Sequence, residues 1–269
     1  MDQRSGIYRT NSSGILSFVP KPLPPDLEID DETEELLEDT KKALFLLDNL
    51  AKQDSDIIPK FIKKESLMSS RIEGIFPGTK RNDELIRSHN RAMEYAVKRI
   101  EAFPLCNRLI REVHAVLMGN EKTPGEFRKT QNWIGTPNTA RYVPPNPKDM
   151  MTAMFDLEKY IDAEDDLDNL VRAALIHYQF ESIHPFLDGN GRTGRILIQL
   201  FLIEKEIISA PVLCISDYFY KHQNEYYDRL NEVRTKGDYE GWITFFLIAV
   251  LESALDEISN VTYGDILNS

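Results

Sequence analysis

A dense cluster of chemically capable side chains lies in the segment from His184 to Arg195, which reads HPFLDGNGRTGR. Gly189 and Gly191 allow the main chain to turn tightly and to approach a ligand closely. Arg192 and Arg195 are three residues apart, so on a helix both guanidinium groups can reach one polyphosphate with charge-assisted hydrogen bonds. The segment therefore predicts an anion-binding site.

The same segment supplies groups that suit transfer chemistry at a phosphate. Free N–H groups at the start of a helix, with the helix dipole, favour a bound phosphate, and Asn190 can add a side-chain donor or cap that helix. Asp188 offers a hard oxygen ligand, and Mg2+ is usually held by one or two carboxylates together with substrate phosphates. His184 is the residue type best suited to taking a proton from a hydroxyl at neutral pH. This set indicates phosphoryl-type transfer rather than an ordinary interhelical loop.

Helical periodicity surrounds this segment on both sides. Apolar residues recur at three- and four-residue intervals, which is typical of amphipathic helices. The expected helices cover residues 32–52, 57–73, 82–103, 107–118, 149–161, 168–182, 191–205, 217–235 and 239–259. Residues 1–30 are rich in proline and are expected to form an extended arm, and residues 119–148 lack helical periodicity. Loops of that length inside a compact domain tend to be lids or binding loops.

Composition limits the classes of function. The chain has 269 residues, 42% of them hydrophobic, which is enough for one large domain or two packed ones. A net charge of -12 argues against broad binding to nucleic acid, because that affinity comes largely from lysine and arginine. Cys106 and Cys214 lack the spacing of a disulfide framework, so a cytoplasmic location is expected, and neither secretion nor membrane insertion is. No Walker A sequence is present, which argues against a P-loop NTPase.

The segment from His184 to Arg195 resembles the signature of the Fic (Fic/Doc) family and matches it at every defining position. Similarity to the family continues over most of residues 60–260. The resemblance implies an all-α fold, a Fic-type helical bundle with a short β-hairpin flap and an N-terminal helical region packed on it. It implies an N-terminal arm and helical region at 1–105 and a catalytic core at 106–269.

The resemblance also implies an activity and a role for each signature residue. The activity is that of a protein adenylyltransferase, which moves AMP from ATP-Mg2+ to a Ser, Thr or Tyr hydroxyl of a protein. His184 would deprotonate the hydroxyl, Asp188 would hold Mg2+, and Phe186 would anchor the loop. The nucleotide-binding residues would be Gly189, Asn190, Gly191, Arg192, Arg195, Tyr226 and Tyr227. Some relatives have asparagine where this sequence has Arg234, a departure that affects the adenine pocket.

A second element resembles the family's inhibitory pattern [S/T]xxxE[G/N], with Ser69, Glu73 and Gly74 at the defining positions. Ser69 and Glu73 are four residues apart and share one face of a helix. The resemblance implies that Glu73 pairs with Arg195 and displaces the γ-phosphate of ATP from a productive position. In some relatives the same glutamate assists removal of AMP, so a bifunctional enzyme stays open.

The segment Arg141, Tyr142 and Val143 resembles the family's flap, which holds a target segment by main-chain pairing. The implied partners are ATP and a target protein, which can be the chain itself, and a homodimer is left open. Membrane and nucleic acid are not expected partners. Two alternatives remain: a Fic-fold enzyme with another nucleotide donor, and a non-enzymatic regulator associated with DNA.

Overall fold

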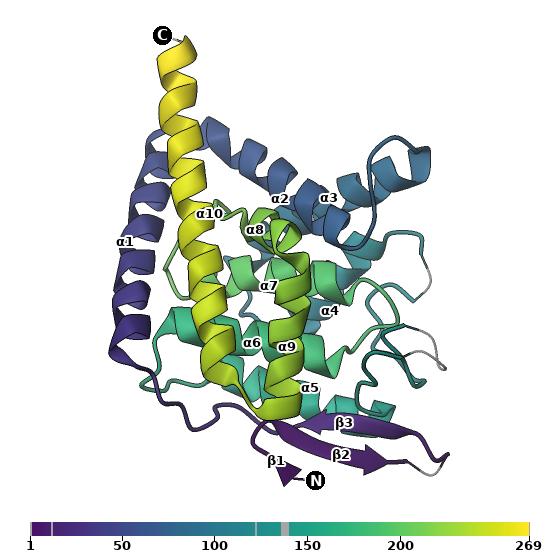
Figure 1. Cartoon of the computed structure of the whole chain (residues 1–269). Helices are drawn as coiled ribbons and strands as arrows, with labels where there is room; N and C mark the ends of the chain where they lie inside the picture. The colour runs from purple at the N-terminus through teal and green to yellow at the C-terminus, as the bar shows by residue number, and fades with distance from the viewer. Residues whose placement is uncertain (1, 12, 122, 136–139, 269) are drawn as a thin grey trace.

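The structure is a computed structural model that describes residues 2–11, 13–121, 123–135 and 140–268. Helices dominate the chain (Figure 1). The α-helices are α1 (Asp31–Gln53), α2 (Ile58–Ile72), α3 (Lys80–Ile100), α4 (Asn107–Met118), α5 (Pro147–Asp162), α6 (Asn169–Ile183), α7 (Asn190–Glu204), α8 (Ile215–Lys221), α9 (Gln223–Lys236) and α10 (Tyr239–Asn268). A short 3-10 helix, η1 (Ser55–Ile57), connects α1 to α2. The strands are β1 (Asp2–Gln3), β2 (Gly6–Thr10) and β3 (Leu16–Pro20).

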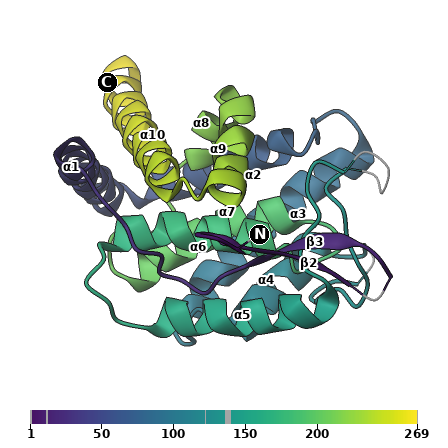
Figure 2. The same cartoon turned by 60° about the horizontal axis from the view of Figure 1, so that its bottom comes forward.

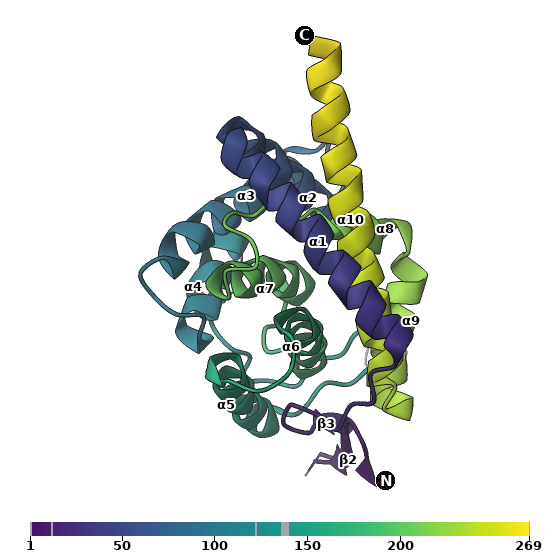
Figure 3. The ribbon, with the colours of Figure 1, turned by 90° about the vertical axis from the view of Figure 1, so that its left-hand side faces the viewer.

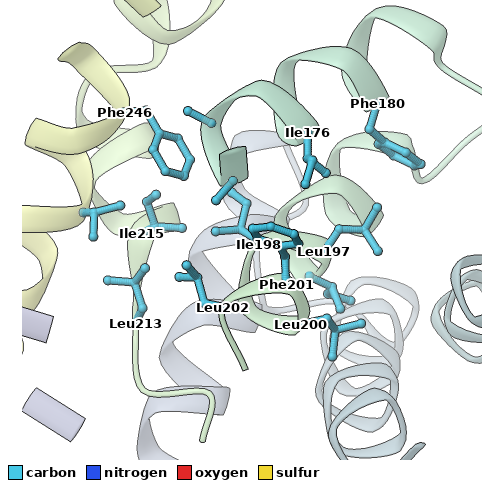
Figure 4. Close-up of a cluster of buried hydrophobic side chains, with 14 of the residues drawn as sticks. Ile176, Phe180, Leu197, Ile198, Leu200, Phe201, Leu202, Leu213, Ile215 and Phe246 are labelled. Carbon is cyan, nitrogen blue, oxygen red and sulfur yellow. The ribbon is translucent and has the colours of Figure 1, made fainter. Parts of the chain in front are cut away.

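Helices α6 and α7 lie at the centre of the bundle. Helices α4 and α5 lie on one side of this pair, and α1 and α10 lie on the other (Figures 2 and 3). Residues 170–183 of α6 are all buried, and a helix that is covered on every side needs neighbours all around it. Figure 4 shows Phe180 of α6, Phe201 of α7 and Phe246 of α10 in one cluster of apolar side chains. The loop between α6 and α7 is therefore attached to two rigid supports.

The N-terminal helices pack directly on the bundle. Helix α1 runs beside α10, α2 packs on α8, and α3 packs on α4. One hydrophobic core extends from Ala43 in α1 to Ala254 in α10. This arrangement confirms the predicted all-α fold with an N-terminal helical region packed on it. The core crosses the predicted division at 105/106, and that division stays a prediction.

Local sequence signals explain several helix ends. Asp30 caps α1 by accepting from the Thr33 N–H, and Asp168 caps α6 by accepting from the Leu170 N–H. Helix α2 ends before Gly74, whose φ of 72° lies in the left-handed region that favours glycine. This end places residue 73 beside the start of α7.

The N-terminal arm differs from the expected unpaired extended chain. Strands β1, β2 and β3 form an antiparallel sheet in which Gly6 pairs with Pro20 and Thr10 with Leu16. The Phe18 N–H of β3 also donates to the Val143 carbonyl at 3.0 Å. The prolines gave no strand pattern in the sequence, although the strands pair locally within residues 2–20. The bond to Val143 then ties the sheet to a segment more than a hundred residues away.

The predicted single helix over residues 217–235 is wrong. The chain leaves helical geometry at His222, which separates α8 from α9. The break lets Phe219 and Tyr226 stack with ring centroids 4.4 Å apart, so tertiary packing outweighs the local helical period. No helix in the described residues has an apolar run long enough to cross a membrane.

Candidate active site

The loop between α6 and α7 begins and ends with left-handed residues. His184 has a φ of 51° and closes α6, and Gly189 has a φ of 75° and precedes α7. This conformation costs about 1–2 kcal/mol for a residue other than glycine, so the surroundings must hold His184 in place. Arg128 does this by donating from Nε to the His184 carbonyl at 2.8 Å and from its main-chain N–H to the Pro185 carbonyl at 2.9 Å. The position of His184 therefore depends on the loop that contains Arg128.

Asn190 closes the loop from inside. Its Oδ1 accepts from the Phe186 N–H at 2.8 Å, and its Nδ2 donates to the Phe186 carbonyl at 2.9 Å. The Thr193 hydroxyl donates to the Gly189 carbonyl at 2.8 Å in the same turn. These bonds hold the buried Asn190 side chain on the loop, so its role toward a ligand is to shape the loop, and its main-chain N–H is free of this pairing. The first N–H groups of α7 have no carbonyl within the helix to bind.

His114 of α4 supports the loop from below. Its ring stacks on Phe186 with centroids 3.6 Å apart and an interplanar angle of 3°. Nδ1 accepts from the Gly125 N–H at 2.9 Å, so Nε2 carries the proton and donates to the Asp188 carbonyl at 3.0 Å. Burial lowers the pKa of His114 to about 4, which keeps the ring neutral near pH 7. Phe186 is fully buried, as its predicted structural role requires.

Arg192 presents a buried cation that forms no ion pair with the residues that the structure describes. Only 3% of the residue is exposed, and within the described part of the chain Nε and Nη1 have no hydrogen-bond partner. Its third nitrogen makes a weak contact, from Nη2 to Met118 Sδ at 3.8 Å. Burial lowers its pKa, but a guanidinium remains charged in proteins. A buried unpaired charge is costly, so this arrangement suits a bound anion.

Arg195, one turn further along α7, is already occupied. Its Nη2 donates to Glu73 Oε1 at 2.8 Å and to the Ser69 carbonyl at 2.9 Å, and its Nε donates to Ser69 Oγ at 2.9 Å. Burial opposes the charge, but the Glu73 carboxylate outweighs it, and the pKa of Arg195 is raised. A Cβ added at Gly191 would overlap Glu73 Oε1, so glycine there admits the carboxylate. The predicted contact between Glu73 and Arg195 is present.

His89 of α3 holds the serine side of this contact. Its Nε2 lies 3.2 Å from Ser69 Oγ, and its Nδ1 lies 2.9 Å from Ser66 Oγ. Because Ser69 Oγ accepts from Arg195, its own proton is directed to His89 Nε2, and His89 Nδ1 donates to Ser66. Burial, followed by the charges of Arg192 and Arg195, lowers the pKa of His89 to about 3. The ring therefore stays neutral and fixes the last turns of α2.

His184 and Asp188, the predicted base and metal ligand, lie at the front of the loop. Burial, then the cations of Arg128 and Arg234, lowers the pKa of His184 to about 3, so the ring is neutral and able to accept a proton. Asp188 is exposed, and its Oδ1 accepts from the Gly189 N–H at 2.7 Å. Within the described residues no three His, Cys, Asp or Glu side chains gather around a common point. One exposed carboxylate beside an anion site fits a Mg2+ that takes its other ligands from phosphates and water.

Comparison with known proteins places these observations in a family. Residues 104–202 match the family model of the Fic/DOC family. Residues 104–202 are a Fic domain.

Curated relatives and solved structures agree with this Fic domain. Protein adenylyltransferase Fic from Culex quinquefasciatus is 36% identical over 138 residues, which are 50% of this chain and 25% of the relative. The protein of that name from Drosophila grimshawi is 33% identical over 172 residues, 60% of this chain and 33% of the relative. The chain thus spans about a quarter to a third of the length of these relatives. A crystal structure of a Fic family protein from Desulfovibrio desulfuricans has the same fold, with a TM-score of 0.74 and 20% identity over 88% of this chain and 77% of that chain.

The two tyrosines beside the Fic signature differ in exposure. Tyr226 is 1% exposed, and its hydroxyl donates to His177 Nε2 at 2.7 Å, so it supports the site from the core. Tyr227 is 41% exposed, and its hydroxyl lies 3.3 Å from Gln223 Nε2. Gln223 also donates to the Ile72 carbonyl at 2.7 Å, which ties α9 to the end of α2. The ring that a nucleotide can reach in this arrangement is Tyr227, and the nucleotide-binding assignment of Tyr226 stays a prediction.

The predicted flap of the Fic domain has hairpin pairing at its base. The Ile134 N–H donates to the Tyr142 carbonyl, and the Arg141 N–H donates to the Ile134 carbonyl, both at 2.9 Å. The Val143 carbonyl accepts from Phe18 of β3. These bonds occupy three main-chain groups of the predicted target-binding segment, and its role toward a target stays a prediction.

Three positioning residues of the candidate site were missed in the sequence. His89, His114 and Arg128 each bond to a partner that is far away in the sequence. No spacing rule connects them to the signature. His177 of α6 is a further buried support, and its Nδ1 donates to the Gly194 carbonyl at 3.1 Å.

Proposed function

We propose that this chain is a protein adenylyltransferase, which transfers AMP from ATP to a hydroxyl side chain of a protein. The observation that carries this proposal is the buried, unpartnered guanidinium of Arg192 at the start of α7. Nucleotide phosphates supply the anion that this cation lacks, and His184 lies at the other end of the same loop. The curated relatives bear the name of this activity.

In the proposed reaction, the nucleotide phosphates lie across the N-terminus of α7. The N–H groups of Gly189, Asn190 and Gly191 donate to phosphate oxygens, and the helix dipole favours their charge. Arg192 binds the β-phosphate, and Arg195 is the partner of the γ-phosphate once it is free. These donors are fixed before the reaction, so they stabilise charge that develops on the phosphate oxygens.

His184 acts as the general base of this transfer. The target hydroxyl gives its proton to His184 Nε2, its oxygen forms a bond to the α-phosphorus, and the bond to the departing pyrophosphate oxygen breaks. General base catalysis is typically worth about 10² to 10⁴ in rate. Asp188 would hold Mg2+, which supplies positive charge to the phosphate oxygens.

We infer that Glu73 inhibits this reaction by occupying Arg195. The carboxylate sits 2.8 Å from Arg195 Nη2, where the terminal phosphate of ATP would otherwise bind. Ser69 and the turn at Gly74 hold it there. We also propose that the same carboxylate assists removal of AMP from a modified protein.

Targets of the proposed transfer are proteins with a Ser, Thr or Tyr hydroxyl in an extended segment beside Arg141, Tyr142 and Val143. The chain itself qualifies as such a protein. A cytoplasmic location belongs to the proposal and agrees with the two cysteines, which are both free thiols.

The test is incorporation of α-labelled ATP into protein in the presence of Mg2+. Four proteins are compared: wild type, Glu73→Gly, Glu73→Gly with His184→Ala, and the control Glu101→Gly. Glu101 is an exposed residue at the end of α3, away from the loop. We expect strong labelling only in the single Glu73→Gly variant, because it keeps the base and frees Arg195.

Absence of label in all four proteins, with ATP binding intact, would contradict AMP transfer from ATP. Labelled GTP, CTP and UTP then test another donor. An AMP-modified protein incubated with wild type tests the removal reaction. Labelling of Glu101→Gly to the level of Glu73→Gly would contradict the specific inhibitory role of Glu73.

A further inference from the structure

Glu181, in the last turn of α6, points a buried carboxylate at the ring of His184. The distance from Glu181 Oε2 to His184 Nδ1 is 4.0 Å. Within the described part of the chain, both Glu181 Oε1 and His184 Nδ1 are buried without a hydrogen-bond partner. Buried polar atoms are nearly always satisfied, so two such exceptions on neighbouring side chains require an explanation.

The fold makes room for this carboxylate at one position of α7. A Cβ added at Gly194 would overlap Glu181 Oε1, so a larger residue there would displace the carboxylate. Gly194 thus provides the space in which Glu181 reaches the catalytic loop. This explains a glycine that the anion site itself does not use.

Charged and titratable groups from several elements face the Glu181 carboxylate. They are Arg195 of α7, Glu73 at the end of α2, Arg234 and Tyr226 of α9, and His184. Burial opposes the negative charge of Glu181. The cations of Arg195 and Arg234 favour that charge, and the carboxylate of Glu73 disfavours it. Arg195 is already bonded to Glu73 and Ser69, so its guanidinium does not satisfy Glu181.

We propose that Glu181 is a positioning residue for His184, whose carboxylate accepts the Nδ1 proton and stabilises the imidazolium formed during transfer. The inference rests on the proposed function. When Nδ1 holds its proton toward Glu181, Nε2 is left free to take the proton of the target hydroxyl. Glu181 remains a carboxylate throughout, and the imidazolium returns one proton to solvent after the transfer. The same division of roles occurs wherever a carboxylate orients a catalytic histidine.

The main-chain carbonyl of Glu181 also lies near the His184 ring and raises its pKa slightly against the larger effect of burial. That carbonyl is present whatever side chain occupies position 181. The substitution Glu181→Gln therefore isolates the carboxylate. It removes the charge and keeps the size and the main-chain acceptor.

The pH dependence distinguishes this role from a purely structural one. The pKa of Glu181 is raised to about 7, mainly by burial; Arg195 and Arg234 act against this rise, and Glu73 adds to it. A neutral carboxylic acid cannot stabilise an imidazolium, so kcat falls as pH decreases through the pKa of Glu181. In the active Glu73→Gly protein this decline begins below pH 7, because the neighbouring anion is gone.

The experiment measures AMP transfer by Glu73→Gly, alone and combined with Glu181→Gln, Glu181→Asp or Glu65→Gln. Glu65 is a matched control, because it is a buried carboxylate that bonds to Ser216 and makes no contact with His184. We expect Glu181→Gln to lower kcat about tenfold or more, part of the range for general base catalysis, with the KM for ATP unchanged. Glu181→Gln should also remove the fall of kcat at acidic pH. Glu181→Asp should restore part of that fall, and Glu65→Gln should leave it unchanged.

A second readout needs no activity. Histidine-selective 15N NMR, with His184→Ala for assignment, reports which ring nitrogen carries the proton. We expect the Nδ1–H form of His184 in the parent protein and a mixture of both forms after Glu181→Gln.

Equal kcat, equal pH profile and an unchanged tautomer in Glu181→Gln would overturn the positioning role. If the Glu73→Gly protein transfers no AMP at all, the proposed function fails, and the tautomer measurement alone decides the role of Glu181.

Discussion

Replacing Glu73 with glutamine should strengthen binding of ATP without strengthening binding of ADP. Arg195 is 1% exposed, and the charged member of its contacts is Glu73, whose side chain is 36% exposed. Glutamine keeps an acceptor near Arg195 Nη2 and removes the negative charge. Arg195 stays charged, so glutamine keeps a hydrogen bond to a cation and loses only the attraction between opposite charges. That attraction is worth about 0.2–1 kcal/mol for exposed pairs. Because Arg195 is buried and Glu73 is only partly exposed, we take the upper end, about 1 kcal/mol.

This difference sets the size of the binding effect. Wild type must give up the ionic contact before Arg195 can bind the γ-phosphate, and the variant gives up a weaker one. About 1 kcal/mol corresponds to roughly fivefold tighter binding of ATP by Glu73→Gln. ADP lacks the γ-phosphate and does not compete for Arg195, so its Kd should not change.

Isothermal titration calorimetry with Mg2+ and a non-hydrolysable ATP analogue measures both constants. Glu101→Gln is the matched control, an exposed helix-terminal glutamate that should leave both constants unchanged. Equal gains for the ATP analogue and ADP would refute competition at Arg195. No gain for either nucleotide would refute the energetic contribution of the Glu73 contact.

Three further outcomes follow from the supports of the site. His114→Ala removes the ring stacked on Phe186 and should lower the free energy of unfolding by about 2–4 kcal/mol in a urea titration; a loss below about 0.5 kcal/mol would contradict the supporting role. Tyr226→Phe leaves His177 Nε2 without its donor and should cost about 1–3 kcal/mol, seen by calorimetry as a lower Tm with an unchanged Kd for ATP. Burial lowers the pKa values of His89 and His177 to about 3 and that of His114 to about 4, so the folded protein binds fewer protons than the unfolded chain below about pH 6.5. The free energy of unfolding should therefore be greatest near pH 6.5 and fall toward pH 5. Glu65 and Glu181, whose pKa values are raised to about 7, oppose this trend, but they are fewer than the three histidines. A free energy of unfolding that does not change with pH over this range would contradict the prediction.

The signature loop could be predicted because its chemistry is contiguous in the sequence. Gly189, Arg192 and Arg195 lie within one turn and one short loop, so their spacing alone places them together. The end of α2 could be predicted from Gly74 for a similar reason. Its contact with Arg195 came from the family pattern, because no local rule joins residues 73 and 195.

The supports of the site could not be predicted in the same way. Arg128 and His114 act through bonds to main-chain carbonyls of a loop more than 50 residues away. Every residue has a main-chain carbonyl, so the sequence does not show which carbonyl will accept such a bond. The break at His222 arises from tertiary packing, which local periodicity does not contain. The strands of the N-terminal sheet pair within residues 2–20, but the bond from Phe18 to Val143 that ties the sheet to the body has no local sequence signal.

Helix α2 is part of the core and carries the proposed inhibitory residue Glu73 at its C-terminal cap, and this limits how the proposed inhibition can be relieved. Phe61 and Ile72 belong to the hydrophobic core, and Glu65 binds the start of α8. Deleting the helix would therefore unfold its neighbours as well as remove Glu73. An activating partner has to act on the last turn of α2 or on the exposed segment after it, near Phe76, which is 48% exposed. A genetic selection for constitutive activity should accordingly yield single substitutions clustered in residues 69–79, and truncations that remove α2 should be absent from it.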